Sequence, residues 1–230
     1  MSRVLVVAAH PDDEILGVGA TIAKRVKQGD ICRAVILGEG ITARGDKREE
    51  FDGTEQNSLK KDAIESSKMI GYEKIDFVGL PDVRFDSIDL LDIVKIVQKF
   101  FFEFKPNIVY THHYGDLNID HRLTYEATLC ASRPVTGWYP NELLCFETPS
   151  STEWNFGRKQ DAFYPNVFVD VEDTIEKKYE AIKCYKGEIR EYPHPRSIEA
   201  LEAIAKRCGT IVNLKYAEAF EQIYKIDKLN

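Results

Sequence analysis

Residues 6–14 read VVAAHPDDE, so an apolar run ends at a histidine that is followed by three acids. His10 and Asp13 are three residues apart, and a turn between a strand and a helix can bring this imidazole and carboxylate to one point. Nitrogen and oxygen ligands suit zinc or a similar divalent ion, and a cation would also offset the repulsion between Asp12 and Asp13. The alternative is an acidic turn at a helix start, with Glu14 favoured by the helix dipole and a solvated histidine.

A second polar cluster, THHYGDLNIDH at residues 111–121, directly follows the strand expected at residues 107–110. His121 could complete a site of two histidines and one aspartate, which leaves open a coordination position as in catalytic zinc sites. Asp120 could orient a histidine by accepting a hydrogen bond from the ring nitrogen that does not bind the metal. The alternative is a polar loop whose histidines bond to nearby backbone groups.

The elements that must position these clusters alternate between strand and helix in the first half of the chain. Strands are expected at residues 3–9, 31–37, 75–78, 107–110, 143–146 and 166–171. Helices are expected at residues 15–26, 58–69, 88–101, 121–132, 174–184, 198–208 and 217–224. This order predicts an α/β fold of three layers, Rossmann-like, with a mostly parallel sheet and helices on both faces. Ligands of such sheets lie beyond the carboxyl ends of the strands, where both clusters fall.

Length and composition restrict the class of protein. A chain of 230 residues with 43% hydrophobic residues fits a single domain over residues 1–230. The formal charge of −7, without a long basic run, argues against nucleic-acid binding. The sequence leaves open whether the chain forms a homo-oligomer.

Cysteine spacing and apolar runs bear on location. The five cysteines are scattered without a CxxC pair, so we expect neither a thiolate zinc site nor a disulfide framework. Reduced cysteines are typical of a cytoplasmic protein. We see no signal peptide and no apolar run that would insert into a membrane.

The motif AHPDDE, followed downstream by DH at residues 120–121, resembles the signature of the LmbE/PIG-L-like zinc-dependent N-acetylglucosamine deacetylases. Further blocks similar to this family lie at residues 38–44, 79–86, 194–197 and 216–220, so the resemblance spans nearly the whole chain. It implies a Zn²⁺ cofactor, with another divalent transition metal as the alternative.

The resemblance also implies roles for individual residues. His10, Asp13 and His121 match the metal ligands, and Asp12 matches the catalytic acid and base. Asn118 stands where the family often has a histidine that is credited with helping the oxyanion.

The oxyanion role has three candidates in this chain. The amide of Asn118 could donate to the oxyanion, or His113 or His194 could take the place of the missing histidine.

Four residues are candidates for binding the substrate. Arg44 resembles a substrate-binding arginine of the family and could bind a phosphate, or it could be a solvated loop residue. Asp82 and Arg84 could form hydrogen bonds with sugar hydroxyl groups, or they could form a structural ion pair. Arg196 is the fourth candidate, although the segment that contains it could simply start the next helix, with Ser197 as its cap.

The expected function is zinc-dependent removal of acetyl from an N-acetylglucosamine-type sugar or its conjugate, a small-molecule substrate that is nucleotide-linked or carries another group. One alternative is a metal-dependent hydrolase of another amide. The other is a non-catalytic, Rossmann-like module that binds a nucleotide or a sugar. Against that module, no GxGxxG motif follows the first strand, since Gly17 and Gly19 fall within the expected helix.

Overall fold

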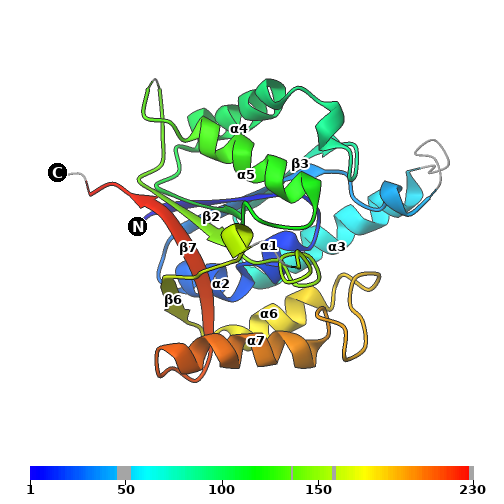
Figure 1. The fold of residues 1–230 in the computed structure, drawn as a ribbon, viewed down its shortest axis with the longest axis vertical. Coiled ribbons are helices and arrows are strands. Elements are labelled where there is room, and N and C mark those ends of the chain that lie inside the picture. Colours follow the sequence, from blue (N-terminus) through cyan, green and yellow to red (C-terminus); the bar gives the residue numbers. More distant parts are fainter. Residues whose placement is uncertain (46–52, 136, 157–158, 228–230) are drawn as a thin grey trace.

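A sheet of seven strands runs through the centre of the molecule, with helices on both sides (Figure 1). The computed structural model describes residues 1–45, 53–135, 137–156 and 159–227. The strands of the described residues are β1 (Arg3–Ala8), β2 (Ile31–Gly38), β3 (Lys74–Leu80), β4 (Ile108–His112), β5 (Glu142–Phe146), β6 (Val167–Asp170) and β7 (Ala217–Lys225). The α-helices are α1 (Asp13–Leu16), α2 (Gly19–Lys27), α3 (Thr54–Ile70), α4 (Leu90–Phe104), α5 (Ile119–Ala131), α6 (Ile175–Ile182) and α7 (Ile198–Ile211).

The strand order is β3-β2-β1-β4-β5-β7-β6. The pairs from β3 to β5 are all parallel, whereas β7 runs antiparallel to both β5 and β6. The chain moves from β1 outward through β2 to β3 and then returns to β4 on the other side of β1. The carboxyl ends of β1 and β4 therefore lie side by side at the point where the direction of winding reverses, which is the usual ligand site of such sheets.

Two apolar cores separate the sheet from its helices, because alternate residues of a strand point to opposite faces. Val4 and Val6 of β1 pack in the core under α2, α3, α6 and α7. Leu5 and Val7 pack in the core under α4 and α5. Burial of such a side chain contributes about 1.5–3 kcal/mol. The predicted three-layer α/β fold with a mostly parallel sheet is confirmed.

The helix expected over residues 15–26 is wrong in one respect, because the structure divides it into α1 and α2. The carbonyl oxygen of Leu16 accepts a hydrogen bond from Lys178 Nζ at 2.7 Å. The backbone N–H groups of Ala20 and Thr21 donate to the carboxylate of Glu218 at 3.2 and 2.6 Å. Side chains from α6 and β7 thus satisfy the groups left unpaired at the break.

The helix expected over residues 217–224 is also wrong, since these residues form β7. Alanine, glutamate and glutamine favour helices locally, but β7 is held on both edges by hydrogen bonds to β5 and β6. Tertiary pairing therefore overrides the local preference.

The connection from β2 to α3 and the connection from β5 to β6 each contain a short 3₁₀ turn, Thr42–Arg44 and Lys159–Asp161, and part of each connection falls outside the described residues. Among the described helices, none has both the length and the apolar character that a membrane span requires.

Candidate metal centre and active-site cavity

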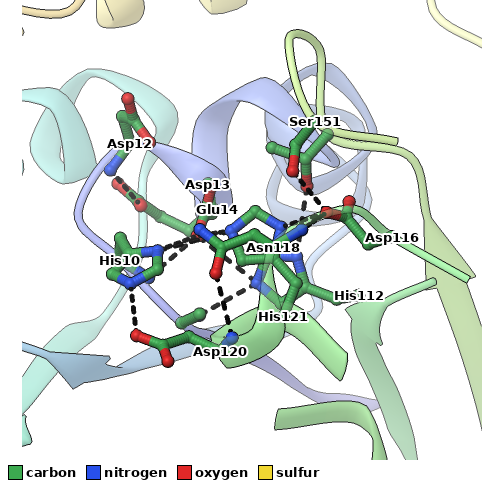
Figure 2. A network of polar contacts seen from close by, with 12 residues as sticks. His10, Asp12, Asp13, Glu14, His112, Asp116, Asn118, Asp120, His121 and Ser151 are labelled. Atoms are coloured by element: carbon green, nitrogen blue, oxygen red, sulfur yellow. Dashed lines mark hydrogen bonds and ion pairs between the residues drawn. The ribbon is translucent and has the colours of Figure 1, made fainter. Parts of the chain in front are cut away.

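The two polar clusters meet at the carboxyl ends of β1 and β4 (Figure 2). His10 and Asp13 come from the turn between β1 and α1, and His121 comes from the first turn of α5. Gly38, at the end of β2, makes room for this turn, because a Cβ there would lie 2.8 Å from the Ala9 carbonyl oxygen and 3.1 Å from the His10 ring. The sheet topology therefore brings together residues that are more than 100 positions apart in the sequence.

Three potential ligand atoms form a nearly equilateral triangle. His10 Nδ1 lies 3.3 Å from His121 Nε2 and 3.6 Å from Asp13 Oδ2, and the third side, from His121 Nε2 to Asp13 Oδ2, is 3.4 Å. Zinc bonds of about 2.0–2.1 Å in a tetrahedron would place their ligand atoms roughly 3.3–3.4 Å apart. The spacing of His10, Asp13 and His121 fits one metal ion.

Carboxylates lie close to the far nitrogen of each of the two histidines. His10 Nε2 lies 3.0 Å from Asp120 Oδ2 and 3.2 Å from Asp82 Oδ1, and His121 Nδ1 lies 3.1 Å from Asp116 Oδ1. A proton on each far nitrogen leaves the near nitrogen as a lone pair. The two lone pairs then face each other and the carboxylate of Asp13, an arrangement that a cation would stabilise.

Asp13 also has an oxygen atom that a cation could contact. Its Oδ1 atom is buried and has no hydrogen-bond partner. Burial alone would raise the pKa of this carboxyl group, but its interactions with the rings of His121 and His112 hold the pKa well below its usual range. The residues present therefore fit a divalent cation by donor type, by spacing and by the unpaired carboxylate oxygen.

His112, the last residue of β4, supports the ring of His121 by stacking on it at a centroid distance of 4.0 Å. Its Nε2 accepts the backbone N–H of Ala9 at 2.9 Å, and its Nδ1 lies 3.1 Å from Thr148 Oγ1. Burial lowers the pKa of His112 to about 4, so the ring is neutral at pH 7. Both nitrogens are thus engaged.

Asp12 lies beside the three potential ligands and is buried at 2% exposure. Its backbone has a φ of 106°, and its N–H donates to Glu14 Oε2 at 3.0 Å. Burial raises the pKa of Asp12 well above its usual value, and the guanidinium of Arg196, with Nη1 at 2.7 Å from Asp12 Oδ2, opposes this rise. A buried carboxylate of high pKa beside a metal site is suited to proton transfer.

Glu188 joins two arginines at the edge of the site. Arg196 Nη1 lies 3.0 Å from Glu188 Oε2, and Arg44 forms an ion pair with Glu188 Oε1. Asp12, Arg196, Glu188 and Arg44 thus form a continuous chain of alternating charges.

Asn118 caps the N-terminus of α5, where its Oδ1 accepts the N–H of Asp120 at 2.9 Å. Because the oxygen is used by the cap, the orientation of the amide is fixed, and its NH₂ group is the end available to a ligand in the cavity.

A cavity of about 250 Å³ opens above these residues. The sequence-predicted site residues that line it are His10, Asp12, Arg44, Asp82, Asn118, His121 and Arg196. Several described non-glycine residues with positive φ also line it, namely Asp12, Ile41, Val83 and Ser150. Such conformations cost about 1–3 kcal/mol each and gather at functional sites.

Three predicted residues are not brought into the cavity. His113 lies on the opposite side of the strand end, with Nδ1 at 2.6 Å from Glu221 Oε2 and Nε2 at 2.8 Å from the Asp161 carbonyl oxygen. His194 packs edge-on against Trp154, and its Nδ1 accepts the N–H of Arg196. Arg84 is exposed and is not among the lining residues.

Sequence reasoning missed His112, Asp116 and Glu188 as contributors to the site. His112 and Asp116 lie in the quoted cluster, so their position after a buried strand was a usable signal. Glu188 belongs to no recognisable motif, and only the fold places it beside the two arginines.

Comparison with known proteins gives a family match and several relatives. The sequence model of the family described as "PIG-L: GlcNAc-PI de-N-acetylase" matches residues 5–132. The chain is 28% identical over 193 residues to the uncharacterized deacetylase YaiS of Escherichia coli K12, which covers 80% of this chain and 90% of the relative. It is 25% identical over 237 residues to 4-oxalmesaconate hydratase of Pseudomonas putida, a match that covers 96% of this chain and 88% of the relative. It is 26% identical over 237 residues to diacetylchitobiose deacetylase of Thermococcus kodakarensis, a match that covers 95% of this chain and 82% of the relative.

The fold is also found in solved structures. A conserved protein of Thermus thermophilus superimposes with a TM-score of 0.75 at 23% identity, over 100% of this chain and 98% of the other. This likeness supports the fold and says nothing further about the substrate.

Proposed function

Because the chain belongs to the PIG-L (GlcNAc-PI de-N-acetylase, LmbE-like) family of deacetylases, which hydrolyse an amide bond, we propose that it uses zinc to remove the acetyl group from an N-acetylglucosamine-type conjugate. The observation that carries this proposal is the triangle of His10, Asp13 and His121 beside buried Asp12. The non-catalytic alternative is not retained, because the family consists of enzymes.

In this proposal His10, Asp13 and His121 hold the metal. Zinc bound there would supply a lowered pKa for a coordinated water, to about 7, and would polarise the substrate carbonyl. Asp120 and Asp116 orient the two histidines through their far nitrogens.

Asp12 acts as the acid and base. It takes the proton of the attacking water and returns a proton to the departing amine, which is otherwise a poor leaving group. Arg196 holds the carboxylate of Asp12 in place through the contact at 2.7 Å. This contact assigns Arg196 mainly to Asp12 and only secondarily to the substrate.

Asn118 provides the donor for the oxyanion. His113 and His194 are less suitable, since neither lines the cavity. Arg44 and Asp82 line the cavity and would bind the hydroxyl groups of the sugar.

A second candidate is hydration of a carbon–carbon double bond, which the likeness to 4-oxalmesaconate hydratase favours. A substrate with several carboxylates would need cationic groups that are not already paired. Arg196 contacts Asp12 and Glu188, and Arg44 contacts Glu188, so the residues that the structure describes around the cavity include few such groups. This pairing favours the amide substrate.

We also propose that residues 1–230 form one domain, which is supported by β1 and β7 lying in the same sheet. All five cysteines are free, which supports a reducing, cytoplasmic location.

The test combines metal content with product analysis. Elemental analysis of the purified chain should find about one zinc per molecule, and acetate release from N-acetylglucosamine conjugates should stop on chelation and return with zinc. A zinc-loaded protein that releases no acetate but removes the ultraviolet absorbance of 4-oxalmesaconate would support the hydratase instead.

A further inference from the structure

Glu14, the second residue of α1, is a fully buried carboxylate with two hydrogen-bond partners. Its Oε2 atom accepts the backbone N–H of Asp12 at 3.0 Å (Figure 2). Its Oε1 atom accepts the hydroxyl group of Tyr185, which is also fully buried. Both oxygens of Glu14 are therefore engaged, and one of them holds the residue that is proposed to act as acid and base.

The backbone of Asp12 lies in a conformation that an aspartate adopts only where its surroundings impose it. The φ of Asp12 is 106°, in the left-handed region. Asp12 occupies the N-cap position of α1, where an aspartate usually accepts a backbone N–H of its own helix, but its side chain makes no such hydrogen bond. Its carboxylate contacts Arg196 instead and lines the cavity, so it is kept for the site.

Glu14 supplies what this conformation of Asp12 requires. A backbone N–H that is removed from water needs an acceptor, and the Glu14 carboxylate provides one from only two residues further along the chain. The hydrogen bond thus closes a tight ring that fixes the turn from residue 12 to residue 14. Glu14 is not among the described residues that line the cavity, so it would affect the reaction through Asp12 and not by touching the substrate.

The segment that follows α6 supports Asp12 at both ends. Tyr185 donates to the carboxylate of Glu14, which holds the Asp12 N–H. Glu188 Oε2 lies 3.0 Å from Arg196 Nη1, and this same nitrogen contacts the carboxylate of Asp12. The N–H of Glu188 donates to the carbonyl oxygen of Tyr185 at 2.9 Å, so both supports belong to one turn of the chain.

We propose that Glu14 is a positioning residue, which together with Tyr185 holds the backbone of Asp12 so that the Asp12 carboxylate reaches the substrate. This inference rests on the proposed deacetylase function, in which Asp12 transfers the proton. The role requires a hydrogen-bond acceptor at the position of Oε2 and does not require a negative charge. An amide in place of the Glu14 carboxylate can therefore perform it.

Two substitutions of Glu14 separate the acceptor from the charge. Glu14→Met has a similar length but no acceptor for the Asp12 N–H, so kcat should fall about 10–10²-fold with little change in KM, as expected when a reacting group is misplaced by about 1 Å. Glu14→Gln keeps an oxygen for this N–H and can turn its NH₂ group to the phenolic oxygen of Tyr185. Its kcat should stay within about threefold of the wild-type value, since the geometry of Asp12 is preserved.

Two buried tyrosines provide a matched pair of variants. The hydroxyl of Tyr185 donates to the carboxylate of Glu14, whereas the hydroxyl of Tyr72 donates to the carbonyl oxygen of the same residue at 3.1 Å. Tyr185→Phe and Tyr72→Phe each remove one such hydrogen bond, so both should lose a similar amount of stability. Only Tyr185→Phe should lower kcat, by about 3–10-fold, because only the carboxylate of Glu14 holds Asp12.

An NMR measurement on the zinc-loaded protein reports on Asp12 without turnover. The protein is labelled with a nitrogen isotope at aspartate, and the amide signal of Asp12 is identified as the one that is lost in Asp12→Asn. An N–H that donates a hydrogen bond inside the protein exchanges slowly with solvent. The exchange of the Asp12 amide should stay slow in Glu14→Gln and Tyr72→Phe and become faster in Glu14→Met.

A wild-type kcat in Glu14→Met, or equal loss of kcat in the two tyrosine variants, would overturn the positioning role. Glu14→Gln as inactive as Glu14→Met would also overturn it, because the charge of Glu14 would then be what matters. If the wild-type protein releases no acetate, the deacetylase function fails, and the exchange of the Asp12 amide still decides whether Glu14 holds this residue.

Discussion

The guanidinium of Arg196 and the carboxylate of Asp12 form an ion pair with Nη1 and Oδ2 2.7 Å apart, although the two residues are 184 positions apart in the sequence. Asp12 is 2% exposed, so the pair is shielded from water. A buried carboxylate without a partner would take up a proton, and a protonated Asp12 could not act as a base. The ion pair therefore joins the C-terminal part of the chain to the residue proposed to transfer protons.

Replacing Arg196 should shift the pH dependence of the reaction. Burial raises the pKa of Asp12 and Arg196 opposes this rise, so Arg196→Met should raise the pKa further. The base is active when ionised, and the acidic limb of kcat/KM should therefore move to higher pH, with a loss of about tenfold or more at pH 7. Arg196→Lys, which keeps the charge, should restore part of the activity. Full pH–rate profiles check this, with exposed Arg207→Met as control.

Asp12→Asn should separate catalysis from metal binding. Asparagine has the same shape but cannot take a proton from water, so kcat should fall by about 10²–10⁴-fold. Because Asp12 is not one of the three grouped ligand residues, zinc content by elemental analysis should stay near the wild-type value. Activity close to wild type in this variant would rule out Asp12 as the base.

Asp120→Asn should weaken metal binding without removing a ligand. Asp120 Oδ2 accepts from His10 Nε2 at 3.0 Å and from the N–H of Val83 at 2.7 Å, while Oδ1 accepts from the N–H of Phe85 at 3.0 Å. An amide must turn its NH₂ group toward one of these donors, so the ring of His10 loses its fixed orientation. Zinc affinity in a chelator competition should fall about 10–100-fold. The exposed Asp86→Asn serves as the control, and equal affinity in both variants would contradict the role of Asp120.

The sequence patterns predicted the features that depend on residues close together in the chain. Buried strands followed by His10 and by residues 111–121 are visible as apolar runs with polar ends, and parallel topology then requires those ends to meet. The sequence does not show in the same way which face of the sheet the last residue of a strand points to. His112 and His113 are neighbours that point to opposite sides, and the sequence does not tell which one faces the site.

Long-range partners account for the elements that the sequence did not predict. Glu218 caps α2 and pairs with Lys178 at 2.7 Å, which divides α1 from α2 and also fixes the position of β7. Residues 217–224 have helical composition, and only their pairing with β5 and β6 makes them a strand. Such interactions join segments that no local pattern connects.

Substitutions at Asn118 should distinguish its role as the helix cap from its proposed role as the donor to the oxyanion. Asn118→Asp keeps an oxygen that accepts the N–H of Asp120, but it replaces the NH₂ group with a second acceptor. Loss of one oxyanion donor typically lowers kcat about 10²–10³-fold, and we expect this effect with little change in melting temperature. Asn118→Ala should lose the same activity and also about 1 kcal/mol of stability from the cap.

Kinetics and thermal unfolding of the two Asn118 variants check these effects together. If Asn118→Asp retains wild-type kcat, the donor to the oxyanion is another group. If both variants lose activity only in proportion to their loss of stability, the residue acts solely as a cap.

Glu147→Gln should stabilise the protein at neutral and alkaline pH. Glu147 directly follows β5, and burial, together with the nearby charge of Glu153, raises its pKa from 4.5 to about 7. Between pH 4.5 and 7 the folded state therefore binds more protons than the unfolded state, and the free energy of unfolding falls as the pH rises through this window. The variant should exceed the wild type by about 1–3 kcal/mol at pH 8 and match it near pH 4.5.

Urea denaturation of Glu147→Gln at the two pH values measures this difference. Exposed Glu126→Gln is the control and should show none. Burial also raises the pKa of Glu14 to about 7, so the variant should reduce the pH dependence of stability without abolishing it. A gain of equal size at both pH values would instead show that the introduced amide packs better than the native side chain, and that the ionisation of Glu147 has no part in the effect.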